Sequence, residues 1–273
     1  GLAGRHQGHR PLRGPVVDAH LEELAQLEVA NSGHTLGNAR WEAGNVRDVL
    51  NYYSAAPERL FGRQIPVAGG VDLTFREPLG VVGVIVPWNF PMPIAGWGFA
   101  PALAAGNTVV LKPSELTPLT TIRLGELALR AGLPQDVFTV LPGRGSVVGE
   151  RFVKHPAVRK IVFTGSTETA RMINRTLAER DGPIIPFVAE TGGQNAMIVD
   201  SSALPEQVTR DVISSAFQSA GQRCSALRVL FVQEDVADGM IKMIAGAMEA
   251  LKVGDPSDLA TDVGPVIDQA AKK

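Results

Sequence analysis

The sequence predicts an α/β protein whose core is a parallel sheet with helices on both faces, followed by the start of a second α/β unit. Short apolar runs that do not alternate in polarity recur along the chain, as strands buried on both faces of a parallel sheet do. Segments of helical period separate most of these runs, which is typical of strands joined by helices. The apolar fraction of 45% and the charged fraction of 20% are those of an ordinary globular protein.

The first part of the chain predicts an arm, two helices and a hairpin. Residues 1–14 are basic and rich in Gly, His and Arg, without the apolar stretch of a secretory signal, so we expect a disordered or atypical arm over 1–17. Polar-rich stretches of helical period predict amphipathic helices at 18–30 and 37–56. Two short runs on either side of Ala-Gly-Gly at 68–70 predict a hairpin, at 64–67 and 71–75.

The rest of the chain alternates between expected strands and expected helices. Apolar runs predict strands at 81–86, 108–111, 137–141, 160–163, 185–189 and 196–199. The helices expected between them lie at 94–105, 119–131, 147–154 and 167–179. A second unit starts near residue 191 and contains a helix at 205–220, a strand at 228–232 and a helix at 236–251. We therefore expect one domain over 18–190 and another over 191–273.

Composition argues against several classes of partner. A net charge of −2 lacks the positive field of a nucleic-acid surface, and no apolar run reaches the ~20 residues of a membrane-spanning helix. The single cysteine fits a reducing compartment, so we expect a cytoplasmic protein. The histidines show no metal-ligand spacing with Cys224, so we expect no metal site and interpret them as surface or hydrogen-bonded side chains. We interpret Glu22, Glu23 and Glu28 as a solvated helix face.

Polar side chains follow four of the predicted strands. Asn89 follows the first strand of the sheet, Lys112 and Glu115 follow the second, Ser166 follows the run at 160–163, and Glu190 follows the run at 185–189. Ligands of parallel sheets bind beyond the carboxyl ends of the strands. Packing alone does not explain polar groups at so many strand ends, and we therefore expect a ligand cleft there.

Cys224 is the only cysteine of the chain and lies in Gly-Gln-Arg-Cys-Ser at 221–225. A lone thiol cannot form an internal disulfide, so it is either a small buried hydrophobe or a reactive nucleophile. A thiol needs activation to be a good nucleophile at neutral pH. The neighbouring Arg223, the carboxylate of Glu190 and the amide of Asn89 favour the nucleophile.

Glu190 and Asn89 are the candidate partners of the thiol. Glu190 ends an apolar run and precedes Thr-Gly-Gly, where a carboxylate suits a general base; an ordinary strand-end carboxylate has the same pattern. Asn89 lies in Pro-Trp-Asn-Phe-Pro at 87–91, where the prolines hold the loop rigid and the aromatic neighbours suggest a pocket wall. A rigid amide can donate to a developing oxyanion, and an Asn favoured by turn geometry is the alternative.

Two further segments could hold a nucleotide. Lys112 and Glu115, in Lys-Pro-Ser-Glu, offer a cation and a carboxylate to a phosphate or a ribose. The alternative is a solvated loop, whose sequence can be similar. Phe-Thr-Gly-Ser-Thr at 163–167 opens a helix whose N-terminal amides favour an anion, and Ser166 is equally suited to be a helix N-cap. No G-x-G-x-x-G occurs, so the usual dinucleotide fingerprint is absent.

Taken together, these segments resemble the aldehyde dehydrogenase family. The resemblance covers about residue 22 to the end and rests on five motifs in family order, at 87–91, 112–115, 163–167, 190–193 and 221–224. It implies a Rossmann-like NAD-binding domain over 18–190 that lacks the usual glycine fingerprint. It also implies an oligomerisation hairpin arm at 62–78 and a catalytic domain, here truncated, over 191–273.

The resemblance implies NAD-dependent oxidation of an aldehyde to a carboxylic acid. Cys224 is the implied nucleophile, which forms a thiohemiacetal and then a thioester. Asn89 and the backbone N–H of Cys224 form the implied oxyanion hole, and Glu190 activates the hydrolytic water. Lys112 and Glu115 are implied ribose contacts, and the carboxylate favours NAD over NADP. The other implied cofactor contacts are Val86, Pro87, Trp88, Ser114, Gly145, Phe163, Thr164, Gly165, Ser166 and Gly192.

The resemblance to subfamilies is divided. Residues 80–167 resemble betaine-aldehyde-type members, whereas the chain from about residue 186 resembles the glutamate-semialdehyde (pyrroline-5-carboxylate) dehydrogenase domain of bifunctional proline-utilisation proteins. The second resemblance implies proline catabolism and oxidation of L-glutamate γ-semialdehyde to glutamate, with Ser225 as a contact to the substrate carboxylate. A homo-oligomer is implied for a complete chain.

The sequence leaves alternatives to this function. The family's later Glu-x-Phe-Gly-Pro segment is missing, so one alternative is a truncated, catalytically inactive NAD-binding fragment. A betaine-aldehyde-type dehydrogenase is another. Glu190 argues against a CoA-acylating dehydrogenase, which has no use for a hydrolytic base. The lack of any histidine after His155 argues against a thiol hydrolase.

Overall fold

The start of the described chain is helical where the sequence predicts the end of an arm. The computed structural model describes residues 14–272, so the arm expected over residues 1–13 lies outside the described residues. From Gly14 onward the chain is helical in α1 (Gly14–Asp18), and Val17 is buried in the main core. The expected end of the arm at residue 17 is therefore wrong, because Val17 is part of the core and α1 packs against α3.

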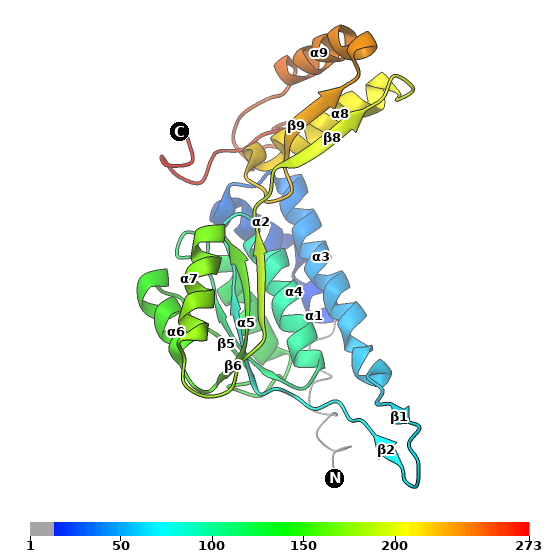
Figure 1. The fold of residues 1–273 in the computed structure, drawn as a ribbon. Helices are drawn as coiled ribbons and strands as arrows, with labels where there is room; N and C mark the ends of the chain where they lie inside the picture. Colours follow the sequence, from blue (N-terminus) through cyan, green and yellow to red (C-terminus); the bar gives the residue numbers. More distant parts are fainter. Residues whose placement is uncertain (1–13, 273) are drawn as a thin grey trace.

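Two amphipathic helices and a hairpin follow, as the sequence predicts. Helix α2 (Leu21–Ser32) ends at Gly33, whose left-handed φ of 77° favours glycine, and α3 (Leu36–Ser54) runs on to a short 3₁₀ turn at Ala56–Arg59. Strands β1 (Gln64–Ile65) and β2 (Asp72–Leu73) pair antiparallel and are exposed. Figure 1 shows this hairpin projecting beyond the helices and the sheet.

The largest sheet of the described residues is parallel, with the strand order β5-β4-β3-β6-β7. Its strands are β3 (Val81–Ile85), β4 (Thr108–Lys112), β5 (Phe138–Val140), β6 (Val158–Gly165) and β7 (Phe187–Thr191). The chain builds outward from β3 to β5 and then returns to place β6 on the other side of β3. The strand order therefore reverses between β3 and β6, which is where such sheets bind ligands.

Helices cover both faces of this sheet (Figure 1). One face carries α4 (Pro91–Ala104) and α5 (Leu119–Arg130) with the first helices, and a Cβ added to Gly98 of α4 would come within 2.5 Å of Val84. The other face carries α6 (Glu150–Lys154), which a π-turn at Gly145–Gly149 precedes, and α7 (Thr167–Ala178). On that face a Cβ at Gly83 would come within 2.6 Å of the Phe152 ring. The glycines thus let helices approach the sheet closely on both sides.

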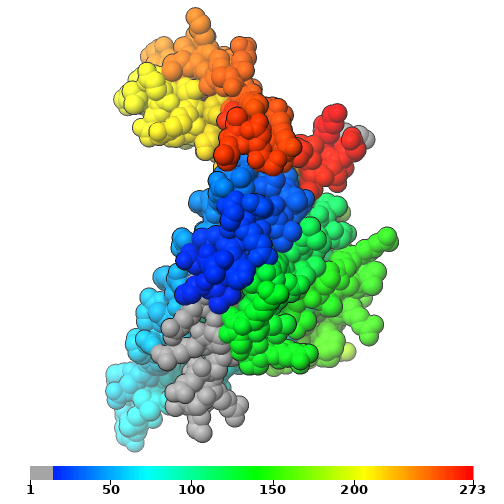
Figure 2. Space-filling view, turned by 180° about the vertical axis from the view of Figure 1, so that it is seen from behind, coloured from blue at the N-terminus to red at the C-terminus, as the bar shows by residue number. Residues whose placement is uncertain are grey.

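A second α/β unit stands at the carboxyl end of the strands. It contains a parallel pair, β8 (Asn195–Val199) and β9 (Leu227–Val232), with α8 (Pro205–Phe217), a 3₁₀ turn (Gln218–Gly221) and α9 (Glu234–Glu249). The last segment turns back toward the first helices, where the N–H of Leu36 donates to the backbone oxygen of Pro256. Figure 2 shows this orange to red segment against the blue helices.

These elements confirm the predicted fold class of an α/β protein with a parallel sheet and helices on both faces. Within residues 14–272, no helix combines the length and apolar character that crossing a membrane requires.

Candidate active site

Cys224 lies between two cavities at the carboxyl end of the sheet. We call the first, of about 400 Å³, the substrate-side cavity; its lining includes Asn38, Trp41, Phe90, Trp97, Gln218 and Ser225. We call the second, of about 410 Å³, the sheet-edge cavity; its lining includes Pro87, Trp88, Thr164, Gly165, Ser166, Glu190 and Gly192. Asn89, Arg223 and Cys224 line both cavities. Cys224 is exposed, so the alternative of a buried hydrophobe is wrong.

Asn89 is held against the loop that carries Cys224. It lies between β3 and α4, and its Nδ2 donates a 2.9 Å hydrogen bond to the backbone oxygen of Gln222. A side-chain amide has two N–H donors, so one remains for another acceptor. The Oδ1 atom is buried without a hydrogen-bond partner. The amide is therefore held against the Cys224 loop and keeps one N–H donor for a ligand.

The loop before Cys224 has an uncommon backbone. Ser219 and Ala220 both have φ of 55°, and Gly221 has φ of 70°. Left-handed conformations of residues other than glycine cost on the order of 1–3 kcal/mol each and persist only where surrounding contacts hold them. Among these contacts, Arg228 donates to the backbone oxygen of Gly221 at 2.9 Å. The left-handed turn thus directly precedes the segment that carries the exposed thiol of Cys224.

Asn195 is a positioning residue that the sequence analysis missed. Its Nδ2 donates to the backbone oxygens of Cys224 at 2.7 Å and Ala226 at 2.9 Å, which ties the loop to the start of β8. The signal in the sequence was a polar residue directly before a predicted apolar strand.

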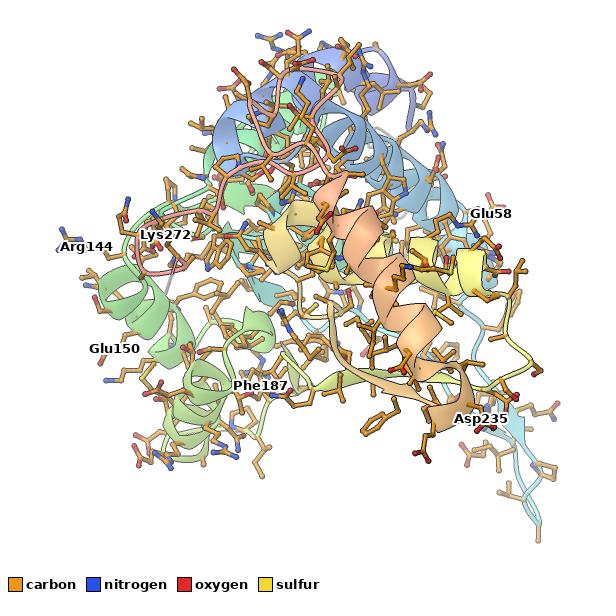
Figure 3. The ribbon with its side chains drawn as sticks, turned by 90° about the horizontal axis from the view of Figure 1, so that it is seen from above. Glu58, Arg144, Glu150, Phe187, Asp235 and Lys272 are labelled. Carbon is orange, nitrogen blue, oxygen red and sulfur yellow. The ribbon has the colours of Figure 1, made fainter. Side chains whose placement is uncertain are left out.

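Figure 3 views this end of the molecule from above, with Glu150 on α6 and Asp235 on α9 on opposite sides.

Glu190 enters the sheet-edge cavity from the last strand of the sheet. It pairs in register with Thr164 of β6 and is exposed, one residue before β7 ends. Ser166 caps α7, because its Oγ accepts a 3.1 Å hydrogen bond from the N–H of Thr169. The N-cap expected of Ser166 is thus present, and the same residue also faces the cavity.

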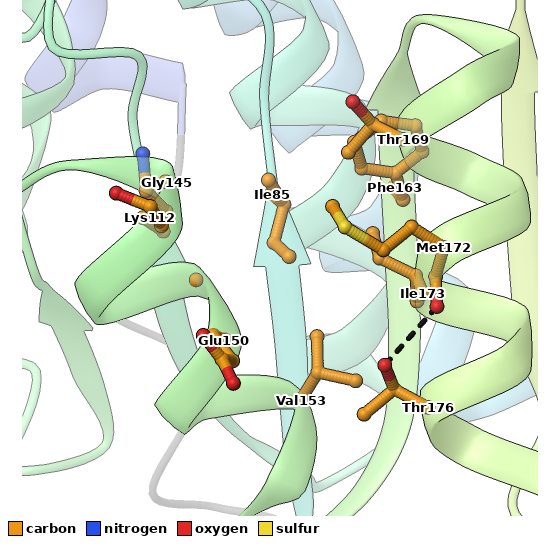
Figure 4. Close-up of a pocket in the computed structure, with 12 residues that line it drawn as sticks. Ile85, Lys112, Gly145, Glu150, Val153, Phe163, Thr169, Met172, Ile173 and Thr176 are labelled. Atoms are coloured by element: carbon orange, nitrogen blue, oxygen red, sulfur yellow. Dashed lines mark hydrogen bonds between the residues drawn. The ribbon is translucent and has the colours of Figure 1, made fainter.

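A third cavity, of about 540 Å³, lies over the sheet between α6 and α7 (Figure 4), and we call it the sheet-face cavity. Lys112, Ile85 and Phe163 stand side by side on three neighbouring strands and form part of its lining. Gly145 lies at one rim and Met172 of α7 borders the other side (Figure 4). The lining residues that the sequence analysis missed are both apolar and polar: Ile85, Val153, Met172 and Ile173, with Ser146, Gly149, Glu150, Thr169 and Thr176.

Lys112 is the buried cation of this cavity. Its Nζ donates to the backbone oxygen of Pro113 at 2.8 Å and lies 3.7 Å from the carboxylate of Glu115. Burial lowers the pKa of Lys112, and the neighbouring Glu115 only partly opposes this shift. An ammonium group has three N–H donors, so Lys112 can also donate to a ligand in the cavity.

Three of the predicted cofactor contacts do not line these cavities. The side chain of Val86 is buried in the main core, so only its backbone could face a ligand. The Oγ of Ser114 accepts a hydrogen bond from the N–H of Leu116, and Glu115 is exposed beside Lys112. The other predicted site residues line one of the three cavities.

The expected solvated face of α2 is wrong for Glu28. Glu22 and Glu23 are exposed, but Glu28 is fully buried beside His34 and Glu42. A ring nitrogen of His34 and one carboxylate oxygen each of Glu28 and Glu42 lie within 4.8 Å of one another, and His34 Nδ1 makes a direct contact with Glu42 Oε1. The helical spacing from Leu24 to Glu28 and Ser32 places this carboxylate on the buried stripe, and that was the available signal.

Comparison with known proteins agrees with this geometry. The family model for the aldehyde dehydrogenase family matches residues 14–273. The chain belongs to the aldehyde dehydrogenase family. It is 46% identical over 260 residues to the bifunctional protein PutA of Escherichia coli K12, a match that covers 94% of this chain and 19% of the relative.

Solved structures of family members have the same fold. A structure of proline utilization A with proline bound in remote sites has a TM-score of 0.92 and 47% identity, and the match covers 99% of this chain and 28% of that one. A structure of PnpE in complex with nicotinamide adenine dinucleotide has a TM-score of 0.93 and 36% identity, covering 97% of this chain and 55% of that one. This aldehyde dehydrogenase chain thus spans about a fifth of the E. coli relative and about half of PnpE.

Proposed function

We propose that this chain carries the nucleophile, oxyanion donor, hydrolytic base and cofactor cleft of an NAD-dependent dehydrogenase that oxidises an aldehyde to a carboxylic acid. The observation that carries the proposal is the position of Cys224 and Asn89, which line both the substrate-side cavity and the sheet-edge cavity. The Cys224 thiol can reach a carbonyl carbon that is held at this junction. A water molecule beside Glu190 can reach the same carbon from the sheet-edge cavity.

The sheet-edge and sheet-face cavities fit an extended dinucleotide. The sheet-face cavity has apolar walls from Ile85, Val153 and Met172 that suit a flat base, and the buried Lys112 ammonium suits the adjoining ribose. The N-terminus of α7 at Ser166 offers amide donors to a pyrophosphate. The dinucleotide, when bound, supplies the acceptor for a hydride from the substrate carbon.

The residues of the chain then divide the chemistry. The thiolate of Cys224 forms a bond to the aldehyde carbon while the C=O π electrons move to oxygen, and the free N–H of Asn89 stabilises the oxyanion. Loss of hydride leaves a thioester on Cys224. Glu190 accepts a proton from a water molecule that attacks this thioester, and cleavage of the C–S bond releases the acid and the thiolate.

The substrate that we propose is L-glutamate γ-semialdehyde. The support is the 46% identity to the bifunctional protein PutA, together with two polar residues in the lining of the substrate-side cavity. Arg223 brings a positive charge and Ser225 a hydroxyl to this cavity, and both groups suit an aldehyde that carries a carboxylate. A betaine aldehyde carries a cation, which Arg223 would repel.

The proposed cofactor is NAD rather than NADP. Glu115 lies 3.7 Å from Lys112, which lines the sheet-face cavity, and its negative charge would oppose a 2′-phosphate bound beside Lys112. We propose the cytoplasm as the location, since a reducing compartment preserves an exposed free thiol.

The hairpin supports a homo-oligomer. Phe61, Val71 and Phe75 are 73%, 74% and 77% exposed in and beside β1 and β2. Large apolar side chains that gather on a projecting hairpin suit burial against another copy of the chain.

The test combines a binding measurement with a single-turnover assay. The purified chain is titrated with NAD and then mixed at stoichiometric concentration with glutamate semialdehyde or betaine aldehyde. We expect NAD binding and an NADH burst with the first aldehyde, and we expect Cys224→Ala to retain binding and lose the burst. NAD binding without a burst in the wild type would leave a nucleotide-binding fragment, and an unchanged burst in Cys224→Ala would reject the nucleophile.

A further inference from the structure

A stack of rings and cations links the buried acid cluster to both loops of the candidate active site. The rings of His34 and Phe90 have centroids 4.7 Å apart, and the guanidinium carbon of Arg223 lies 5.8 Å from the centroid of Phe90. Phe90 directly follows Asn89, and Arg223 directly precedes Cys224. The position of the Phe90 ring is therefore coupled to the amide donor on one loop and to the thiol on the other.

The stack closes into a circuit on α3. Arg223 Nη1 donates to Gln218 Oε1 at 2.5 Å, and Gln218 Nε2 donates to Asn38 Oδ1 at 2.5 Å. Asn38 lies one helical turn before Glu42, which contacts His34 at the other end of the stack. One helix thus holds both ends of the arrangement that spans the two loops.

Within the buried cluster, His34 and Glu42 share a hydrogen bond. His34 Nδ1 and Glu42 Oε1 are in direct hydrogen-bond contact, so the pair can hold a proton between the ring and the carboxylate. Three carboxylate oxygens of the cluster are buried without a well-aligned hydrogen bond, namely both oxygens of Glu28 and the Oε2 of Glu42. The free energy of the cluster therefore depends strongly on the charge that His34 carries.

We propose that His34 is a positioning residue: its imidazolium, paired with Glu42 and stacked on Phe90, sets the spacing between Asn89 and Cys224, and loss of its proton loosens the Cys224 loop. This proposal rests on the proposed function for the roles of Asn89 and Cys224. The charged groups that face His34 are Glu28 from α2, Glu42 from α3 and Arg223 from the Cys224 loop.

The charges around His34 agree with this direction. Burial lowers the pKa of His34, but the hydrogen bond and charge of Glu42, with the charge of Glu28, outweigh burial and the opposing Arg223 and raise it above 6.5. A group whose pKa is raised by folding contributes stability that is complete below its unfolded pKa and is lost as pH rises through the folded value. The stack is therefore expected to be complete at low pH and to loosen as pH rises through the folded pKa of His34.

The test is amide hydrogen exchange over residues 218–226, corrected for the intrinsic pH dependence, between pH 6 and pH 9. In the wild type we expect protection of this segment to fall by about threefold or more as pH rises. His34→Leu should show low protection at every pH, and His34→Lys, which keeps a cation, should retain protection at high pH. The matched control His155→Leu changes an exposed histidine and should leave the segment unchanged.

The outcomes separate positioning from a general loss of structure. Faster exchange throughout His34→Leu, including residues 119–130 of α5, would indicate global destabilisation; the wild-type and His34→Lys pH profiles then decide the proposal. Protection that is independent of pH in the wild type, or equal in His34→Leu and the wild type, would overturn it, as would stoichiometric divalent metal in the purified protein. Exchange needs neither aldehyde nor NAD, so a failure of the proposed dehydrogenase activity is seen separately.

Discussion

The side-chain amide of Asn89 donates a 2.9 Å hydrogen bond to the backbone oxygen of Gln222, two residues before Cys224. This bond joins the loop after β3 to the loop between α8 and β9, although the two residues are 133 positions apart in the chain. The first domain supplies the amide and the second unit supplies the thiol. The proposed oxyanion hole therefore depends on how the two units are joined, and the first prediction concerns this bond.

Asn89→Ala should lower the rate of the NADH burst by about 10²–10³-fold, because an oxyanion donor is lost. The loop bond to Gln222 is lost as well, at a cost of about 0.5–1.5 kcal/mol in the free energy of unfolding. Stopped-flow burst kinetics and urea unfolding measure the two effects. Asn89→Asp keeps the size of the side chain without an N–H donor and should show the same kinetic loss. A normal burst in either variant would exclude Asn89 as the donor.

Glu190→Gln should slow thioester hydrolysis by about 10²–10⁴-fold and leave the NADH burst intact, since the amide cannot accept the proton of the attacking water. The measurement compares the burst amplitude with the steady-state rate and detects an acyl-enzyme by mass spectrometry. Glu168→Gln, on the exposed first turn of α7, is the control and should behave as the wild type. Loss of the burst in Glu190→Gln would give this carboxylate a different role.

Glu115→Gln should raise the affinity for NADP relative to NAD by about fivefold to tenfold, because roughly 1 kcal/mol of charge repulsion toward a 2′-phosphate is removed. Titration of the purified variant with each dinucleotide measures the ratio. Glu126→Gln alters an exposed carboxylate of α5 that pairs with Arg123 and should not change the ratio. An unaltered preference in Glu115→Gln would mean that this carboxylate does not face the ribose.

Glu28→Gln should reduce the pH dependence of stability. Burial, followed by the charge of Glu42, raises the pKa of Glu28 to about 7 from 4.5. The folded state therefore binds this proton more tightly than the unfolded state, and stability falls as pH rises from about 4.5 through 7. Urea unfolding at pH 5 and pH 8 should show a smaller difference in the variant, by on the order of 2–3 kcal/mol or less.

The matched control for this measurement is Glu22→Gln, because Glu22 lies on the same helix with an exposed side chain that pairs with Arg40. Its effect on the pH dependence should be small, since solvent screens an exposed ion pair. Equal pH dependence in Glu28→Gln and the wild type would show that the buried carboxylate does not release its proton in this range.

Much of the candidate site followed from the order of residues at strand ends. Asn89, Lys112, Ser166 and Glu190 each come after an apolar run, and parallel strands must bring their carboxyl ends to one edge. The structure has these strands side by side, with Ile85 in register with Lys112 and Phe163. Local periodicity was sufficient here because strand polarity and connection by helices leave few arrangements of the sheet.

Glu28 and Asn195 mark what local patterns missed. A glutamate on a polar-rich helix is usually solvated, and only the packing of α2 against α3 places Glu28 beside His34 and Glu42. Asn195 gains its role from backbone oxygens of Cys224 and Ala226, which lie in the loop before β9, 29 and 31 positions along the chain. Both positions depend on contacts between segments that the sequence separates.

The sequence by itself determined the parallel α/β sheet, the polar residues at its carboxyl edge and the single thiol, because strand and helix periods and residue identity are local properties. Only the tertiary structure decided that Cys224 and Asn89 line both cavities and that His34, Phe90 and Arg223 stack across two loops. These relationships arise from the docking of the second unit on the sheet, and docking is set by packing and hydrogen bonds between distant segments rather than by any local pattern.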